Sequence, residues 1–136
     1  MNPKVSSKVT AKTMNMKQRV ELLKERREEV AAGGGERRLE KQRAEGKLTA
    51  RERIAELVDP DSFQESGMFA QHRATLFGMA DSTLPADGVV TGWGDVDGRP
   101  VAIVAYDFTV MAGSMGQTGE IKVTLIRETR CVEYAR

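Results

Sequence analysis

The sequence is poor in the residues that build disulfides and metal centres. Its 136 residues include one cysteine, Cys131, and one histidine, His72. A single cysteine excludes an internal disulfide and a cysteine-based zinc site, and it is typical of a reducing compartment. We expect this thiol, which falls inside a predicted helix, to be inert, and we predict no metal site.

The sequence also lacks a long hydrophobic run. No stretch approaches the roughly 20 apolar residues that span a bilayer. The Lys-rich start, MNPKVSSKVTAKTMNMKQR, is not followed by an apolar stretch that could act as a signal peptide. We therefore expect a cytoplasmic protein that does not contact a membrane. With 40% apolar and 30% charged residues, the chain can form one modest globular core.

Aromatic residues are scarce, at 5%. Their scarcity helps to interpret the uneven distribution of charge along the chain. Residues 1–56 carry 15 Lys and Arg against 9 Asp and Glu, whereas residues 57–136 carry 6 against 11. A basic half can bind nucleic acid, but here the cations alternate with Glu, as in KERREE and GERRLEK, and no aromatic side chains are interleaved to stack on bases. We expect no nucleic-acid partner. A solvated helix face or a subunit-contacting surface explains the pattern better.

The first part of the chain predicts helices. Residues 1–15 read as a disordered lead-in, because residues 1–13 lack apolar periodicity. A helix follows from Asn15, with its apolar positions near one face at Met16, Val20, Leu23 and Val30. The triplet Gly33 to Gly35 reads as its C-cap and a hinge. The alternative, a phosphate-binding loop, needs a preceding strand and a following Lys-Ser or Lys-Thr, and both are missing.

Two further helices are predicted before residue 59. One covers Glu36 to Glu45 and ends at Gly46. The next covers Ala50 to Leu57 and is opened by a Thr-x-x-Glu capping box, Thr49 and Glu52.

The second part of the chain predicts strands. Phe63 to Phe69 reads as an extended segment, with Phe63 and Met68 as candidate core contacts. A hairpin follows, with Asp97-Gly98 as its turn and a second strand from Val101 to Val110. The almost unbroken apolar run VAIVA suits a strand covered on both faces, as in an α/β core.

A glycine-rich turn, Ala112 to Gly116, then leads into a helix from Gln117 that is apolar on two sides. Such a turn places free backbone N–H groups at a helix N-terminus, where they can bind an anion or an oxyanion. Gly113, Ser114 and Gly116 are the residues concerned. The alternative, that these glycines only allow the helix to pack tightly on the sheet, is at least as well supported by spacing alone.

Two titratable residues are candidates for catalytic groups. His72 has no Ser, Cys or Asp at a motif spacing, so we expect a structural or surface role for it. Asp107 falls inside the predicted buried strand, and a contact with the following turn is a better explanation than catalysis.

Several segments together resemble one family. GKLTARERI, DGVVTGWG and DFTVMAGSMG, within a similarity from Met16 to Thr124, resemble the N-terminal part of the carboxyltransferase (β) subunit of biotin-dependent acyl-CoA carboxylases of the propionyl-CoA carboxylase type. The resemblance implies an α/β fold, namely a partial crotonase-like (ClpP/crotonase) carboxyltransferase N-terminal domain preceded by helices. On this basis residues 16–58 would be N-terminal helices and residues 59–136 an incomplete crotonase-like domain.

The resemblance also implies a reaction, the transfer of a carboxyl group from carboxybiotin to the α-carbon of an acyl-CoA. Backbone N–H groups serve there as oxyanion holes. Because the glycine pairs that form those holes lie further along the family's sequence, no catalytic residue carries over. Gly113 and Ser114 are expected to line the acyl-CoA side.

The partners implied are an acyl-CoA, a biotin carboxylase or biotin carrier subunit, and further copies of the full-length subunit. The biotin would be carried by the partner, and no cofactor is expected to be bound by this chain. After Thr124 the chain departs from the family sequence as LIRETRCVEYAR, so we expect an enzymatically silent fragment. The alternative is a small non-catalytic CoA-binding or subunit-assembly module.

Overall fold

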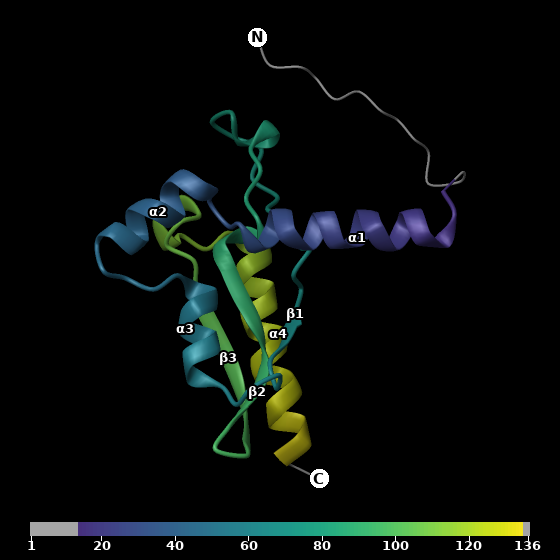
Figure 1. The fold of residues 1–136 in the computed structure, drawn as a ribbon, viewed down its shortest axis with the longest axis vertical. Helices are drawn as coiled ribbons and strands as arrows, with labels where there is room; N and C mark the ends of the chain where they lie inside the picture. The colour runs from purple at the N-terminus through teal and green to yellow at the C-terminus, as the bar shows by residue number, and fades with distance from the viewer. Residues whose placement is uncertain (1–13, 135–136) are drawn as a thin grey trace.

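The computed structural model describes the backbone of residues 14–134 and the side chains of residues 14–129. Nearly all of the expected lead-in, and the side chain of Cys131, lie outside these ranges. None of the helices in the described part is both long and apolar enough to cross a membrane. The helices and strands, in chain order, are α1 (Met16–Ala31), α2 (Glu36–Ala44), α3 (Ala50–Leu57), β1 (Gln64–Ser66), β2 (Val89–Val96), β3 (Arg99–Tyr106) and α4 (Gln117–Tyr134), with three short 3₁₀ turns, η1 (Met79–Asp81), η2 (Ala86–Gly88) and η3 (Met111–Gly113) (Figure 1).

The starts of α1 and α3 are fixed by side chains that cap them. The Thr49 hydroxyl accepts from the Glu52 backbone N–H, and the Glu52 carboxylate accepts from the Thr49 N–H. This is the capping box that the sequence predicts. Asn15 and Gln18 form the same arrangement at α1. Each box satisfies backbone donors that have no partner within the helix.

Within residues 14–134 the strands form one antiparallel sheet in the order β1-β2-β3. The predicted hairpin is confirmed, with Val96 opposite Arg99 across the Asp97-Gly98 turn. The Asp59 carboxylate accepts from the backbone N–H groups of both turn residues. The expected end of the second strand is wrong, because β3 stops at Tyr106 rather than Val110. Asp107 therefore lies just outside the strand.

The two faces of the sheet are covered by different helices, since successive strand residues point to opposite faces. On one face α3 brings Ala50 and Ile54 against Val90 and Ile103. On the other face α4 packs on β2, and Gly119 lies close to the Val89 side chain. Figure 1 shows α3 and α4 on the two sides of the β2–β3 hairpin. The core is therefore a small α/β arrangement.

The expectation that VAIVA is covered on both faces is wrong. Only Ile103 in β3 is buried, whereas Ala102 and Tyr106 are exposed. The reason is positional: the two exposed residues lie on the sheet face that α4 covers, and β3 is an edge strand in the described part of the chain, so the cover from α4 does not reach all of it. An apolar run of this kind is typical of a strand that can be buried on both faces, but the described part of the chain supplies only part of the cover.

The Gly33–Gly35 triplet joins α1 to α2 and packs on the loop after β3. The C-cap expectation is confirmed, since the backbone N–H of Gly33 donates to the Val30 carbonyl at the end of α1. The hinge stays a prediction, and in this structure the turn is held to the loop after β3. The Gly34 N–H donates to the Thr109 hydroxyl (3.0 Å), and the Arg38 guanidinium donates to the Thr109 carbonyl (3.2 Å). A Cβ at Gly34 would overlap that carbonyl.

We predict that Gly34→Ala costs more stability than Gly46→Ala. The new methyl group at position 34 collides with the Thr109 backbone, whereas Gly46 has open space around it and carries only the strain of its φ of +72°. We expect a loss of about 2–3 kcal/mol for Gly34→Ala and about 1 kcal/mol for Gly46→Ala. Urea unfolding of both variants measures the difference, and equal losses would show that the turn is not docked.

Candidate functional site

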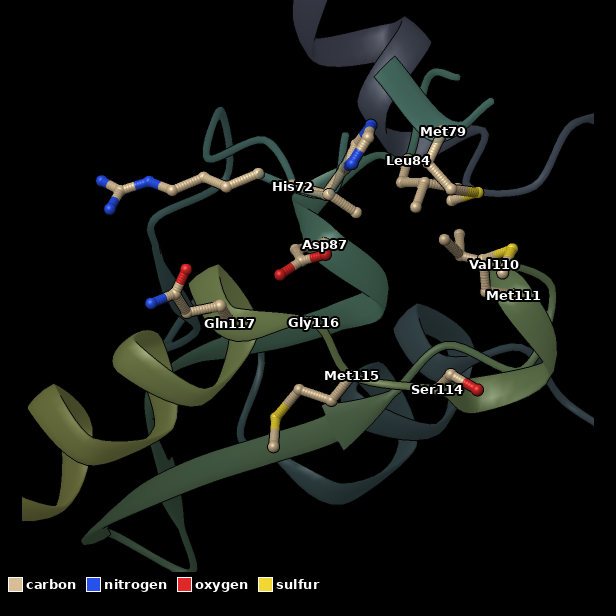
Figure 2. A pocket seen from close by; sticks show the side chains of 12 residues that line it. His72, Met79, Leu84, Asp87, Val110, Met111, Ser114, Met115, Gly116 and Gln117 are labelled. Carbon is tan, nitrogen blue, oxygen red and sulfur yellow. The ribbon is translucent and has the colours of Figure 1, made fainter. Parts of the chain in front are cut away.

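A cavity of about 270 Å³ lies where the start of α4 meets the segment before β2. Figure 2 shows Asp87 and Gln117 on one side of it and Val110 and Met111 on the other. Its wall combines apolar side chains with a few polar groups, as small-molecule sites do. The lining residues are His72, Arg73, Ala74, Met79, Leu84, Asp87, Val110, Met111, Ser114, Met115, Gly116 and Gln117.

The structure brings the glycine-rich turn to this cavity. Ser114 and Gly116 are part of the wall. Gly113 ends η3 immediately before Ser114 and lies against Phe108. Of the two candidate residues, Ser114 therefore borders the cavity directly and Gly113 sets the path of the backbone into it.

The start of α4 is occupied by a carboxylate from the protein itself. Asp87 is 3% exposed, and its carboxylate accepts from the Gly119 backbone N–H at 2.7 Å. A Cβ at Gly116 would overlap the same carboxylate. The close approach at Gly116 is therefore to the Asp87 carboxylate and not to the sheet, and tight packing of the helix on the sheet through this glycine stays a prediction. The positive end of the helix is used to bind an internal anion.

Backbone strain gathers around the cavity. Ala86 and Asp87 have φ values of +52° and +53°, and Met111 and Ala112 have values of +46° and +52°. Side chains make this left-handed conformation costly, and such residues cluster at functional sites. Here they form two short 3₁₀ turns, η2 and η3, that carry Asp87 and Met111 into the cavity wall.

Lys122 fastens α4 to the segment that carries Asp87. Its side chain is buried, and its Nζ donates to the carbonyls of Ala86 (3.0 Å) and Val89 (2.6 Å). Burial lowers the pKa of Lys122 from 10.5 to about 8, against the opposing effect of the Glu65 and Asp87 carboxylates. An ammonium group is thus held in a largely apolar setting by backbone carbonyls.

His72 lies in the cavity wall and is held by the segment opposite. Its Nε2 donates to the Ser82 carbonyl at 2.7 Å, because a carbonyl oxygen can only accept. The other ring nitrogen, Nδ1, is buried and has no hydrogen-bond partner among the described residues. The structural role expected for His72 agrees with the first contact. The second leaves a buried ring nitrogen unsatisfied in the described part of the chain.

Asp107 holds the loop after β3. Its carboxylate accepts from the Thr109 backbone N–H (2.9 Å) and from the Thr109 hydroxyl (2.6 Å). The expected contact with the following turn is confirmed, although the residue lies beyond the strand and not within it.

Comparison with known proteins defines the class to which this arrangement belongs. The structure is similar to the crystal structure of the transcarboxylase 12S hexamer with methylmalonyl-coenzyme A and methylmalonic acid bound, with 55% identity, a TM-score of 0.83, and coverage of 85% of this chain and 23% of that one. It is also similar to a single-chain, multi-domain long-chain acyl-CoA carboxylase, with 25% identity, a TM-score of 0.72, and coverage of 90% of this chain and 13% of that one. The fold is therefore that of a crotonase-like carboxyltransferase, in part.

The family model described as the carboxyl transferase domain matches residues 41–134. The chain belongs to this family. The match continues past Thr124, so the expected departure from the family sequence after that residue is wrong.

Curated relatives share about half of the matched residues. The methylmalonyl-CoA carboxyltransferase 12S subunit of Propionibacterium freudenreichii subsp. shermanii is 58% identical over 108 residues, which are 79% of this chain and 21% of the relative. The propionyl-CoA carboxylase beta chain of Cereibacter sphaeroides is 50% identical over 113 residues, 83% of this chain and 22% of the relative. The mitochondrial propionyl-CoA carboxylase beta chain of Homo sapiens is 46% identical over 110 residues, which are 79% of this chain and 20% of the relative. The chain thus spans about a fifth of these relatives.

Sequence reasoning missed Asp87 and Lys122 as parts of the site. Lys122 left a signal, because it shares the spacing of Gly119 and Ile126 and so falls on the buried side of the helix. Asp87 left no such signal in the sequence, since its contact with Gly119 joins residues that are 32 positions apart.

We predict that the stability of this chain rises with pH above about 8 because of Lys122. The folded-state pKa is about 8, below the ordinary value of 10.5, so between these values the unfolded chain keeps a proton that the folded chain has released. Unfolding then takes up a proton, and raising the pH favours the folded state. In this window we expect the thermal midpoint of the wild type to rise relative to that of Lys122→Met, which keeps the apolar stem. Parallel pH profiles would contradict this assignment.

Proposed function

We propose that this chain is the N-terminal part of a carboxyltransferase subunit that moves a carboxyl group from carboxybiotin to the α-carbon of an acyl-CoA. That reaction would form a bond between the α-carbon and the carboxyl carbon and break the bond from the carboxyl carbon to the biotin nitrogen, and the proton lost by the α-carbon would pass to the biotin ureido group that leaves. The observation that carries the proposal is the 58% identity to a methylmalonyl-CoA carboxyltransferase subunit across 79% of this chain. Propionyl-CoA or methylmalonyl-CoA is the substrate class that fits the named relatives.

Within that reaction, we assign the chain one wall of the acyl-CoA site. The cavity beside α4 has apolar side chains for an acyl or pantetheine segment, such as Met79 and Val110, and polar atoms at its edge. The His72 ring, held by its hydrogen bond to the Ser82 carbonyl, gives the same wall a flat surface. Gly113 and Ser114 provide backbone and hydroxyl groups at the glycine-rich turn.

We assign no catalytic residue and no cofactor to this chain. The Asp87 carboxylate lies in the cavity wall, but it already accepts from the Gly119 N–H and holds α4. It is a positioning residue. The oxyanion holes that stabilise the enolate and the biotin ureido oxygen would come from other parts of a full-length subunit. The biotin would arrive on a separate carrier or carboxylase subunit, and the complete subunit would assemble with further copies of itself.

The acyl-CoA site can be tested by NMR on the 136-residue chain. We expect propionyl-CoA to shift the backbone amide signals of Gly113, Ser114 and Gln117 most, with weak affinity because one wall only is present. Adenosine 3′,5′-bisphosphate, which lacks the acyl-pantetheine arm, should leave those signals unchanged. Ser114→Val should weaken binding about tenfold, and Thr124→Val, an exposed change elsewhere on α4, should not.

Shifts confined to another region, or none at millimolar ligand, would remove the site assignment. Carboxylation of propionyl-CoA by this chain together with a biotin carboxylase and a biotinylated carrier would contradict its expected inactivity. Micromolar CoA binding by a stable monomer would favour the second candidate, an independent CoA-binding or assembly module.

A further inference from the structure

The turn of the β2–β3 hairpin contains a dipeptide that can react with itself. Asp97 and Gly98 have φ values of +51° and +71°, as the two central residues of a tight type I′ turn do. In an Asp-Gly pair the backbone nitrogen of the glycine lies near the carboxyl carbon of the aspartate, and glycine has no side chain to hinder the approach. Figure 1 shows this turn at the end of the sheet away from the start of α4, so it is separate from the cavity.

The reaction of such a pair needs no reagent other than water. The Gly98 nitrogen attacks Asp97 Cγ, the new C–N bond closes a succinimide ring, and the N–H proton leaves with the carboxyl hydroxyl as one water molecule. Water then opens the ring at either carbonyl. Opening at the former backbone carbonyl leaves Gly98 joined to the side-chain carbon, which is isoaspartate, and adds one methylene group to the main chain. In a loop of two residues that addition would disturb the pairing of Val96 with Arg99.

The structure holds this dipeptide by its backbone N–H groups. The Asp59 carboxylate accepts from the Asp97 N–H with one oxygen (3.1 Å) and from the Gly98 N–H with the other (2.8 Å). An ionised acceptor binds an amide proton more strongly than a neutral acceptor does. Asp59 therefore makes the Gly98 nitrogen harder to deprotonate and keeps it from turning toward Asp97 Cγ.

Asp59 is itself fixed beside the turn. Its N–H donates to the Asp95 carbonyl (2.7 Å). Its carbonyl accepts from the Ser62 hydroxyl (2.8 Å), and the Ser62 hydroxyl oxygen accepts from the Asp95 N–H (3.0 Å). These bonds tie the segment after α3 to β2, so the acceptor is held at the turn by contacts within residues 59–98.

We propose that Asp97-Gly98 is a site of isoaspartate formation and that Asp59 keeps it unreactive in the folded protein. A second Asp-Gly pair, Asp87-Gly88, is held differently. The Asp87 carboxylate is buried and accepts from the Gly119 N–H, and the Gly88 N–H donates to the Pro85 carbonyl. The chain thus contains two pairs with the same chemistry, and Asp59 contacts the first of them.

The experiment is to age the folded 136-residue chain at mildly acidic pH and to measure isoaspartate at both pairs. The endoproteinase Asp-N cleaves before aspartate but not before isoaspartate, so missing cleavages before Asp97 and before Asp87 give each site its own signal in a mass spectrum. We expect Asp59→Ala to raise the rate at Asp97 at least about tenfold, because the turn loses two hydrogen bonds to a charged acceptor. The rate at Asp87 should stay unchanged.

Two controls separate this effect from charge and from stability. Asp61→Gly removes the same charge from an exposed residue whose φ of +59° suits glycine, and it should leave the rate at Asp97 as in the wild type. Gly34→Ala destabilises the chain at another turn, so any rise that it causes through unfolding should appear at both pairs. Asp59→Asn keeps one acceptor oxygen and should give an intermediate rise. It decides the test if circular dichroism shows that Asp59→Ala does not fold.

Equal rates at Asp97 in the wild type and in the Asp59 variants would overturn the proposal. A slower rate in the variants would overturn it as well, because the carboxylate would then be a base that promotes the attack. A parallel rise at Asp97 and Asp87 would replace it with general unfolding.

Discussion

The attachment of α4 to the start of β2 is the contact on which the site depends. Asp87 accepts from the Gly119 N–H, and Lys122 donates to the carbonyls of Ala86 and Val89. The two contacts run in opposite directions. Asp87, in the segment before β2, accepts from the helix, whereas Lys122, on the helix, donates to the segment at the start of β2. They fix the direction in which α4 leaves the glycine-rich turn. Without them neither the turn nor the cavity beside it would have a defined wall.

Both contacts place a charged group where water is largely excluded, and such groups are stable there only with partners. The partners here are mostly backbone groups. The strained residues Ala86 and Asp87 belong to the same segment, so the conformation that costs free energy locally is held by bonds to α4. This interdependence explains why strain, buried charge and the cavity coincide in one small region.

Much of the local structure could be predicted from the sequence. The capping box at Thr49 and the Asp97-Gly98 turn depend on residues a few positions apart, and both were found. The family and its crotonase-like fold could be predicted from the resemblance of longer motifs. What could not be predicted depends on distant residues: the early end of β3, the exposed side of the VAIVA run and the role of Asp87 all follow from which elements are present to cover them. The division at residue 58 stays a prediction, although α3, before it, packs on the sheet that follows.

The docked Gly33–Gly35 turn has a consequence for synthesis of the chain. Gly34 donates to Thr109, which lies 75 positions later, so α1 and α2 emerge from the ribosome long before their contact exists. At ordinary elongation rates of about 5–20 residues per second, that interval is about 4–15 s. Throughout it the basic helices must persist without the loop that holds them. They are therefore made well before the loop that holds them, and they are among the last elements to find their place.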